Sequence, residues 1–339
     1  AAFGISPTEL LTTMRLLRGL YNCPKALFNQ GCVATIGNFD GVHIGHQTII
    51  QRLTEKAAHF DLPSVVILFE PHPQEYFRPD AAPARLFKLT DKIQALKALG
   101  VDYVLCFRFN QEFAELRAED FIQRVLIEHL NVQHLFIGDD FRFGYQRQGD
   151  FEMLKERGEG FFTVEANQSV TLEIDGEQQR ISSSLVREAV ANNRFDRAER
   201  YLNRAYQLSG KVAHGDKQGR EIGFATANIP LKRLKSPLKG VYAVWVYGIS
   251  ASSPQYKSSQ QSPKRFQAVA NVGQKPTLKQ SPERLEVHVL DFKGDLYGQQ
   301  IHIEPIAKLR GEQKFSSVEE LKAQIADDIE AAREIFDRL

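Results

Sequence analysis

Two histidines that flank a glycine, His43 and His46, have a type and spacing that could act on phosphate. They follow a short, apolar, β-branched segment at 33–36, which is typical of a buried parallel strand. The segment at 47–59 repeats apolar residues at helical spacing and predicts a helix with one buried face. A strand, a turn and a helix N-terminus make an anion site, because free backbone N–H groups and the helix dipole favour phosphate.

Two imidazoles beside an α-phosphate could stabilise the negative charge that develops as pyrophosphate leaves. The sequence contains no G-x-x-x-x-G-K-[ST] pattern, so this site is not a P-loop. The histidine pair alone would be explained more simply by a tight turn with two surface histidines. Gly37, Gly41 and Gly45 favour the phosphate site instead, since glycine allows the backbone to approach a ligand closely.

Strand-like and helix-like segments alternate through the N-terminal half of the chain. Further strands are predicted at 64–69, 101–107 and 133–137, with helices at 90–100 and 118–129. This alternation predicts a doubly wound parallel sheet.

Two loops follow predicted strands and carry aromatic or titratable residues. The first loop holds Phe69 and His72 at the carboxyl end of a strand, where open α/β sheets bind ligands. The second, at 138–144, holds Asp140 and Phe141, which could accept hydrogen bonds from a flat ring and stack on it. On spacing alone, a turn histidine and an ordinary polar turn are the alternative explanations.

A third polar segment has the pattern of a helix N-terminus. Ser182, Ser183 and Ser184 precede apolar residues at helical spacing, and Arg187 lies one turn further on the same face. Hydroxyl groups, free N–H groups and a guanidinium together suit a triphosphate. A capped surface helix is the alternative.

The pattern changes in the C-terminal half, where strands are short and alternating and glycines mark hairpins. This predicts a small antiparallel β-barrel followed by an amphipathic helix at 317–336. A charged, helical segment at 194–209 is expected to link the two halves.

Glycines and paired oxygen donors mark the chemical stretch of this half. Gly215, Gly219 and Gly223 permit a loop whose backbone can wrap phosphates. Thr226 and Asn228 are two residues apart, so both project from one face of an extended segment. Their oxygen atoms are hard ligands that suit Mg²⁺ bridging the phosphates of ATP. A glycine-rich hairpin with surface polar residues is the alternative explanation.

A single carboxylate, Glu286, lies on a cleanly alternating strand. A strand holds its side chains rigidly, which suits a general base that removes a proton from an alcohol. Without other information, an ordinary exposed strand residue is the simpler explanation of Glu286.

Composition limits the classes of protein that the chain could be. At 339 residues there is room for two domains, and a formal charge of +1 gives no global attraction to nucleic acid. The three cysteines have neither paired nor metal-binding spacing, which favours a reducing, cytoplasmic setting. No apolar run is long enough to span a membrane, and the fold is expected to begin at Met14.

Taken together, the motifs resemble those of the bacterial bifunctional FAD synthetases, in which riboflavin kinase is fused to FMN adenylyltransferase. The segments that carry the adenylyltransferase resemblance are 37–46, 69–73, 138–144 and 180–187. Those that carry the kinase resemblance follow in order at 210–228, 270–277, 284–288 and 291–298. Asp139 and Ala225 depart from the family pattern, which usually has glutamate and proline there.

The resemblance implies a role for each of these residues. The catalytic residues would be Glu286, His43 and His46. The adenylyltransferase would bind ATP through Gly37, Asn38, Phe39, Asp40, His43, His46, Ser182, Ser183 and Arg187. It would bind flavin through Phe69, Pro71, His72, Asp140 and Phe141. The kinase would bind ATP and flavin through Gly215, Lys217, Gly219, Arg220, Gly223, Thr226, Asn228, Asn271 and Glu286, with Thr226 and Asn228 also holding Mg²⁺.

The implied architecture is a Rossmann-like nucleotidylyltransferase domain at 14–193, a linker helix at 194–209 and a six-stranded antiparallel barrel with a terminal helix at 210–339. The implied substrates are riboflavin, FMN and ATP. No nucleic acid or membrane partner is expected, and the enzyme would be a cytoplasmic monomer or weak homo-oligomer. The expected reactions are phosphorylation of riboflavin by the barrel and adenylylation of FMN by the N-terminal domain.

Two other functions share part of this pattern. An adenylyltransferase that acts on another acceptor would keep the two histidines but would not need the motifs of the barrel. A non-catalytic flavin-binding regulator would keep the aromatic loops, but it would be expected to lose Glu286 or the histidines, and all of these are present.

Overall fold

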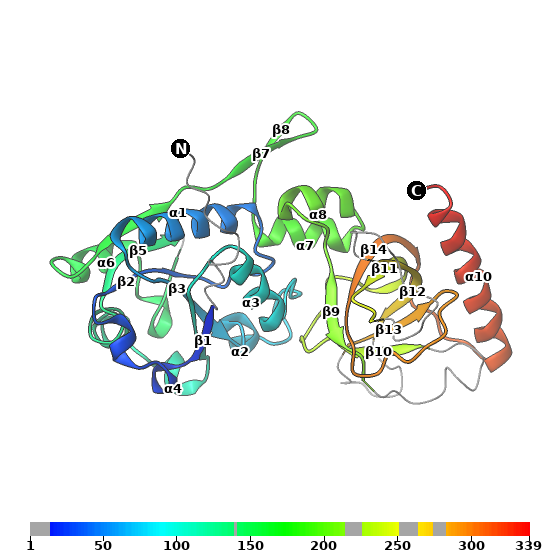
Figure 1. The fold of residues 1–339 in the computed structure, drawn as a ribbon, viewed down its shortest axis with the longest axis horizontal. Helices are drawn as coiled ribbons and strands as arrows, with labels where there is room; N and C mark the ends of the chain where they lie inside the picture. Colours follow the sequence, from blue (N-terminus) through cyan, green and yellow to red (C-terminus); the bar gives the residue numbers. More distant parts are fainter. Residues whose placement is uncertain (1–13, 139–140, 214–225, 251–263, 274–282) are drawn as a thin grey trace, which may run out of the picture. The chain divides into compact units, whose positions relative to one another are not determined.

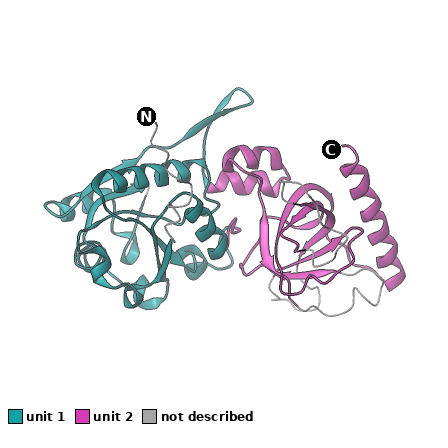
Figure 2. Cartoon of the chain, viewed as in Figure 1, with its two compact units in different colours: residues 1–83, 89–182 teal, residues 84–88, 183–339 magenta. Residues whose placement is uncertain are grey.

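The computed structural model describes residues 14–138, 141–213, 226–250, 264–273 and 283–339 (Figure 1). These residues form two compact units (Figure 2). Unit 1 contains the N-terminal residues up to Ser182 except for 84–88, and unit 2 contains 84–88 together with Ser183–Leu339.

Unit 1 is built on a six-stranded parallel sheet in the order β1-β4-β3-β2-β5-β6. Its strands are β1 Arg15–Arg18, β2 Cys32–Ile36, β3 Ser64–Glu70, β4 Tyr103–Arg108, β5 Val132–Gly138 and β6 Thr163–Asn167. The predicted doubly wound parallel sheet is confirmed. The central strand β2 is buried along its whole length, as its run of apolar residues requires.

The strand order brings the predicted loops together. The chain moves from β2 to β3 and β4 on one side, and later adds β5 and β6 on the other side of β2. The carboxyl ends of β2 and β5 therefore lie at a topological switch point, which is where open α/β sheets bind ligands. The turn at 37–43, which leads into α1 and is called the histidine turn below, follows β2. The loop that carries His72 follows β3, and the segment that carries Phe141 follows β5.

Helices and 3-10 turns connect these strands. They are η1 Leu20–Asn22, η2 Lys25–Phe28, α1 Ile44–Phe60, α2 Pro73–Phe77, α3 Leu89–Ala98, α4 Gln111–Ala114, α5 Ala118–Phe121, the π-helical η3 Ile122–Ile127, η4 Tyr145–Arg147 and α6 Phe151–Gly158. The predicted helix at 47–59 starts earlier, because His43 caps it. A hairpin of β7 Thr171–Ile174 and β8 Glu177–Arg180 had no counterpart in the sequence prediction.

Helix α1, which carries the histidine turn, is fastened to the edge strand β6 by ionic contacts. Arg52 Nη2 and Lys56 Nζ lie 2.7 and 3.1 Å from the two carboxylate oxygens of Glu165. His134 on β5 lies 2.8 Å from the same carboxylate through Nε2. Burial lowers the pKa of the His134 imidazole, and the Lys56 ammonium lowers it further against the opposing effect of Glu165.

Unit 2 is a six-stranded antiparallel sheet in the order β10-β13-β12-β11-β14-β9. Its strands are β9 Leu208–Lys211, β10 Ala227–Pro230, β11 Gly240–Tyr247, β12 Phe266–Gly273, β13 Arg284–Val289 and β14 Gln300–Arg310. A bridge between Ala213 and Asn228 joins the two ends of the sheet, so the barrel is nearly closed. The predicted barrel is confirmed.

The described residues of unit 2 also include the helices α7 Ser183–Ala191, α8 Phe195–Leu202 and α10 Val318–Phe336. Helix α10 buries Ala332 and Phe336 against the outer side of β11 and β12, in a cluster that includes Val241 and Val269. Arg310 on β14 binds Asp328 on α10 through two nitrogens, with Nη2 2.8 Å and Nε 2.9 Å from carboxylate oxygens. This amphipathic helix therefore covers the barrel, as its apolar stripe predicted.

A five-residue strap from the N-terminal half, Ala84–Lys88, belongs to unit 2. Arg233 Nη1 donates hydrogen bonds of 2.9 Å to the carbonyl oxygens of Arg85 and Leu86. Lys88 Nζ donates to the carbonyl of Ser209 at 2.6 Å, and the Leu86 side chain is fully buried. Unit 2 is thus completed by residues that precede the rest of it by more than ninety positions.

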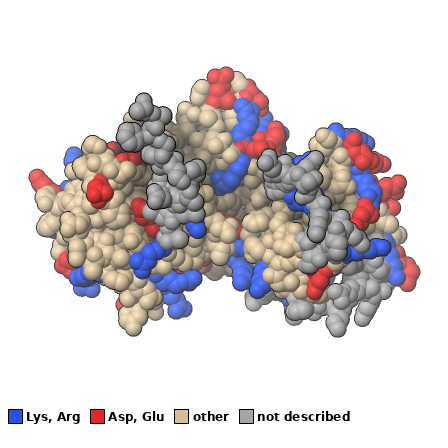
Figure 3. All heavy atoms as spheres, viewed as in Figure 1, with Lys and Arg blue, Asp and Glu red and all other residues tan. Residues whose placement is uncertain are grey.

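The charges of the two units are mixed rather than segregated. On the face drawn in Figure 3, Lys and Arg side chains are interspersed with Asp and Glu side chains. This agrees with the formal net charge of +1.

We expect Leu86→Ala to destabilise unit 2 by about 2–4 kcal/mol, because it removes a buried side chain and leaves a cavity. Trp245 on β11 is the only tryptophan of the chain, so its fluorescence during urea unfolding reports on unit 2. Leu234→Ala is the matched control, since Leu234 is 47% exposed in the same unit. Equal unfolding midpoints for the two variants would contradict a structural role for the strap.

We expect unit 1 to lose stability as the pH falls through about 6.5, the ordinary pKa of histidine. A folded pKa below that value stabilises the fold only while the histidine is neutral, and protonation at lower pH favours the unfolded chain. His134→Gln should flatten this dependence between pH 7.5 and 5.5 in urea titrations followed by far-UV circular dichroism. The Trp245 signal serves as the internal control, and a shift there would mean that the effect does not arise at His134.

Candidate active sites

The turn after β2 is shaped by residues with left-handed backbone geometry. Phe39, Gly41 and Val42 have φ values of 47°, 81° and 42°. A β-branched residue at positive φ is strained, and strain of this kind is found where a binding site fixes the backbone. Phe39 and Val42 are buried at 2% and 0% exposure, so the packing beneath the turn holds this conformation.

The two histidines stack on one another at the start of α1. Their ring centroids are 3.7 Å apart with an interplanar angle of 19°. His43 is the N-cap of the helix, and its Nδ1 accepts a hydrogen bond from the His46 backbone N–H at 3.4 Å. An accepting Nδ1 leaves the proton of the neutral ring on Nε2, which can donate to a phosphate oxygen.

Two glycines make room for this arrangement. A Cβ at position 45 would lie 3.1 Å from His43 Cε1, and one at position 37 would lie 2.9 Å from the ring of Phe39. Phe39 in turn contacts the ring of His46, with centroids 5.0 Å apart. Asp40 is 4% exposed. Phe39 and Asp40, predicted from the resemblance to bind ATP, therefore lie beneath the turn.

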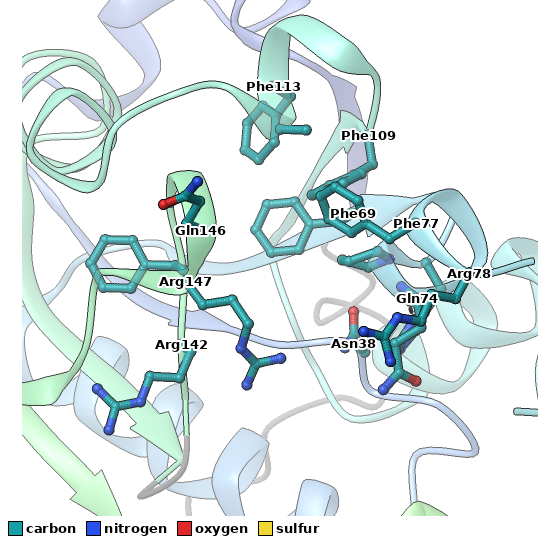
Figure 4. Close-up of a pocket in the computed structure, with 15 residues that line it drawn as sticks. Asn38, Phe69, Gln74, Phe77, Arg78, Phe109, Phe113, Arg142, Gln146 and Arg147 are labelled. Carbon is teal, nitrogen blue, oxygen red and sulfur yellow. Dashed lines mark hydrogen bonds between the residues drawn. The ribbon is translucent and has the colours of Figure 1, made fainter. Parts of the chain in front are cut away.

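A cavity of about 710 Å³ opens beside this turn in unit 1 (Figure 4). It is lined by residues that follow β2, β3, β4 and β5, as the switch point predicts. One side of it is aromatic: Phe69, Phe77, Phe109 and Phe113 contact one another with ring centroids 5.3–6.3 Å apart where they pair. This size and lining suit a flat aromatic ligand.

The rest of the lining is polar. Figure 4 shows Arg142 and Arg147 across the cavity from Phe69 and Phe77, and the amide groups of Asn38 and Gln74 near Arg78. The Oδ1 atom of Asn38 is buried and has no hydrogen-bond partner in the described part of the chain. An amide in that position is available to a ligand. Asn38 thus adjoins both the cavity and the histidine turn.

The structure distributes the five predicted flavin-binding residues unevenly. Phe69 and His72 line the cavity. Pro71 follows a cis peptide bond with Glu70 and is not among the lining residues, and Phe141 stacks on Phe143 at the edge of the core. Asp140 lies outside the described residues. His72 also caps α2, where its Nδ1 accepts from the Gln74 N–H at 3.1 Å.

The sequence prediction missed most of the aromatic wall. Phe77 ends α2, Phe109 follows β4, and Phe113 lies on α4. The signal in the sequence was their position just beyond the carboxyl ends of β3 and β4, where ligand-binding loops occur. Phe77 is 61% exposed, although its ring contacts that of Phe109.

The serine motif falls at the junction between the two units. Ser182 is the last residue of unit 1, and Ser183 begins α7 in unit 2. Arg187 lies on α7, four residues further along the helix.

In unit 2, three predicted kinase residues form a row across neighbouring strands. Asn228 on β10 pairs with Glu286 on β13, and Glu286 pairs with Asn271 on β12. Directly paired residues project from the same face of a sheet, with Cβ atoms about 4.5–5.5 Å apart. Their sequence neighbours Val287 and Ala270 are buried inside the barrel, so the row lies on the outer face.

Thr226 lies just before β10 and is partly exposed, as Asn228 is. Ala227 and Ile229, which alternate with them, are 5% and 0% exposed. The oxygen-bearing side chains of Thr226 and Asn228 therefore share the outer face, as predicted. The remaining predicted kinase residues lie outside the described residues, and they are Gly215, Lys217, Gly219, Arg220 and Gly223.

Comparison with known proteins assigns both halves of the chain. A family model described as FAD synthetase matches residues 25–185, and one described as riboflavin kinase matches residues 202–336. A bifunctional riboflavin kinase/FMN adenylyltransferase from Haemophilus influenzae is 47% identical over 95% of this chain and 99% of its own length. The protein of the same name from Escherichia coli is 47% identical over 95% of this chain and 98% of its own length.

A solved structure also matches nearly the whole chain. It is named as a macrolide-efflux protein from Streptococcus pneumoniae, with a TM-score of 0.66 and 26% identity over 94% of this chain and 98% of that chain. In the part of this chain that the structure describes, no helix has the length and apolarity needed to cross a bilayer.

The two family models match in the order that the sequence motifs predicted, and the relatives match along both halves. An adenylyltransferase that acts on a non-flavin acceptor and a non-catalytic flavin-binding regulator are therefore both disfavoured. The chain belongs to the family of bifunctional riboflavin kinase/FMN adenylyltransferases, with its FAD synthetase domain N-terminal and its kinase domain C-terminal.

Proposed function

We propose that the two reactions of this family are catalysed by separate sets of residues in this chain. The single observation that supports the separation is that His43 and His46 lie in unit 1 and Glu286 lies in unit 2. The adenylyltransferase domain occupies 14–193 and is joined by 194–209 to a kinase domain at 210–339. This boundary assigns α7 by its sequence motif, whereas its packing groups it with unit 2.

In the kinase domain, the 5′-hydroxyl oxygen of riboflavin attacks the γ-phosphorus of ATP, and Glu286 accepts the proton of that hydroxyl. The new O–P bond forms as the bond to ADP breaks. The row across β10, β13 and β12 supports this role, because it holds Glu286 on a rigid strand between Asn228 and Asn271. Asn271 orients the substrate beside the base.

Mg²⁺ is the cation that we propose for the kinase site. Thr226 and Asn228 present neutral oxygen atoms on one face, which are the hard ligands that Mg²⁺ accepts alongside phosphate oxygens. The ion, when bound, neutralises the phosphate charge that builds up during transfer. Gly215, Lys217, Gly219, Arg220 and Gly223 are proposed to enclose the nucleotide from the preceding segment.

In the adenylyltransferase domain, a phosphate oxygen of FMN attacks the α-phosphorus of a second ATP, and pyrophosphate leaves. No covalent enzyme intermediate is needed, because the FMN phosphate is already a nucleophile. His43 and His46 stabilise the departing pyrophosphate at the N-terminus of α1. The residues that bind ATP with them are Gly37, Asn38, Phe39, Asp40, Ser182, Ser183 and Arg187, with Phe39 and Asp40 acting from beneath the turn.

The cavity of unit 1 is the proposed flavin site. Its aromatic wall stacks on the isoalloxazine ring, and Phe69 and His72 belong to its lining. Pro71, Asp140 and Phe141 complete the site from the same two loops. We also propose that the enzyme is a cytoplasmic monomer or weak homo-oligomer, in keeping with its three buried cysteines, which form no disulfide among the residues that the structure describes.

We expect Glu286→Ala to reduce FMN formation from riboflavin by about 10²–10⁴-fold, the usual contribution of a general base. FAD formation from supplied FMN should persist, because that reaction uses the other unit. Chromatographic separation of flavins after incubation with riboflavin or FMN and excess MgATP measures both rates. A folded variant that lost both activities would show that the two-site assignment is wrong.

The reciprocal variant is His46→Gln. We expect it to slow FAD formation from FMN by about 10²-fold or more, since it removes a group that stabilises developing charge. FMN formation from riboflavin should be unchanged in the same flavin assay. His59→Gln is the matched control, because His59 is exposed near the other end of the same helix. If His46→Gln and His59→Gln gave the same rates, His46 would have no catalytic role.

A further inference from the structure

The proposed flavin cavity contains positive charge that binding of the flavin ring alone does not explain. Three arginines line it: Arg78, Arg142 and Arg147. Arg142 is neutralised, because its Nη1 lies 2.5 Å from Asp150 Oδ2. No hydrogen bond or ion pair of the Arg78 and Arg147 guanidinium groups occurs within the described residues. Two cations without an ion-pair partner among the described residues thus line one cavity.

The loop that carries Arg147 is held in an unusual backbone conformation. Gln146 and Arg147 have φ values of 53° and 59°, in the left-handed region that side-chain-bearing residues seldom occupy. The loop is tied down by a hydrogen bond of 2.7 Å from the Tyr145 N–H to the Leu116 carbonyl. A Cβ on Gly144 would lie 2.7 Å from Ala118, so the loop packs closely on α5. Backbone strain that is held by packing marks functional positions.

Arg78 lies on a different wall of the same cavity. It is the C-cap of α2, directly after Phe77, and its N–H donates to the Gln74 carbonyl at 2.9 Å. The capping box at the start of α2, made by His72 and Glu75, fixes this short helix. Phe77 and Arg78 are therefore held next to each other in the cavity lining, where Phe77 can contact an aromatic ring and Arg78 can bind an anion.

We propose that Arg78 and Arg147 select the phosphorylated flavin, by binding the 5′-phosphate of FMN while the aromatic wall binds the ring. This rests on the proposed function, which places flavin in the cavity. A phosphomonoester dianion can receive charge-assisted hydrogen bonds from both guanidinium groups. Asn38, whose Oδ1 has no hydrogen-bond partner within the described residues, lies near Arg78 in the lining of the same cavity.

The selection has a chemical purpose in a bifunctional enzyme. Riboflavin carries the same isoalloxazine ring as FMN, so an aromatic wall alone would bind both. Only FMN has the phosphate that acts as nucleophile in adenylyl transfer. Arginines that bind the phosphate favour the productive flavin and leave riboflavin without a matching contact.

The experiment measures adenylyl transfer from supplied FMN in the full-length chain, with variants Arg78→Gln, Arg147→Gln and both together. Lumiflavin serves as the competitor, because it has the ring but no ribityl chain for the kinase to phosphorylate. We expect each single variant to raise the KM for FMN by about tenfold, the loss of one charge-assisted hydrogen bond at an exposed site. The inhibition constant of lumiflavin should not change.

The two arginines could instead bind the phosphates of ATP. The KM for ATP distinguishes that possibility from binding of the FMN phosphate. An unchanged KM for ATP supports the proposal, whereas a parallel rise in the KM for ATP would assign the arginines to the nucleotide and overturn it. Arg78→Lys and Arg147→Lys should recover part of the affinity for FMN, because they restore the charge but not the bidentate geometry.

Two control variants test for the loss of a positive charge elsewhere in unit 1 and for a change in the ring site. Arg157→Gln removes one positive charge from an exposed position on α6, away from the cavity lining, and should leave every constant unchanged. Phe77→Leu should raise the KM for FMN and the inhibition constant of lumiflavin together, because it alters the ring site. If the arginine variants behaved like Phe77→Leu, the proposal would be wrong. Absence of FAD formation in the unaltered enzyme would instead count against the proposed function.

Discussion

The adenylyltransferase half depends on one constraint, the parallel order of strands around β2. Because β3 and β5 flank β2 on opposite sides, the loops that leave all three strands emerge at one edge of the sheet. Burial of β2 along its full length favours that order, since a strand whose side chains are all buried must be covered on both faces and lie inside the sheet. Residues far apart in sequence, such as His43, His72 and Arg147, come to this edge because their strands do. The motifs supply the chemistry, and the strand order supplies their proximity.

In the barrel, the site residues are brought together by the register between neighbouring strands rather than by the positions of strand ends. In an antiparallel pair, each residue has one partner directly opposite, and a slip by one position would turn Glu286 into the interior. The register is held by the apolar residues that alternate with the site, such as Leu285 and Val287, which are fully buried. The carboxylate is therefore positioned by the hydrophobic core on the opposite face of its strand. The near closure through Ala213 and Asn228 anchors one end of the row.

The spacing of apolar residues predicted the strands and helices, because these elements are determined mainly by residues close together in the sequence. The strand and helix around the histidine turn followed from apolar spacing, and only the helix start was displaced, because His43 provides the cap. Contacts between distant segments had no such signal. The strap at 84–88 joins unit 2 through backbone carbonyls that any sequence would offer to Arg233. The aromatic wall likewise draws Phe77 and Phe109 from two separate loops, and only the strand order shows that they meet.

The two proposed sites bind the same ring, but the residues that the structure describes at each carry opposite charge, and this difference gives the intermediate a direction. The kinase row centres on a carboxylate, Glu286, which disfavours a second negative group once the phosphate dianion has formed and the base has lost its proton. The proposed flavin cavity of unit 1 is lined by the guanidinium groups of Arg78 and Arg147, which have no ion-pair partner within the described residues and favour that dianion. FMN should therefore leave the first site more readily than riboflavin and bind the second more tightly. Opposite electrostatics can order two reactions in this way without any passage that links the sites.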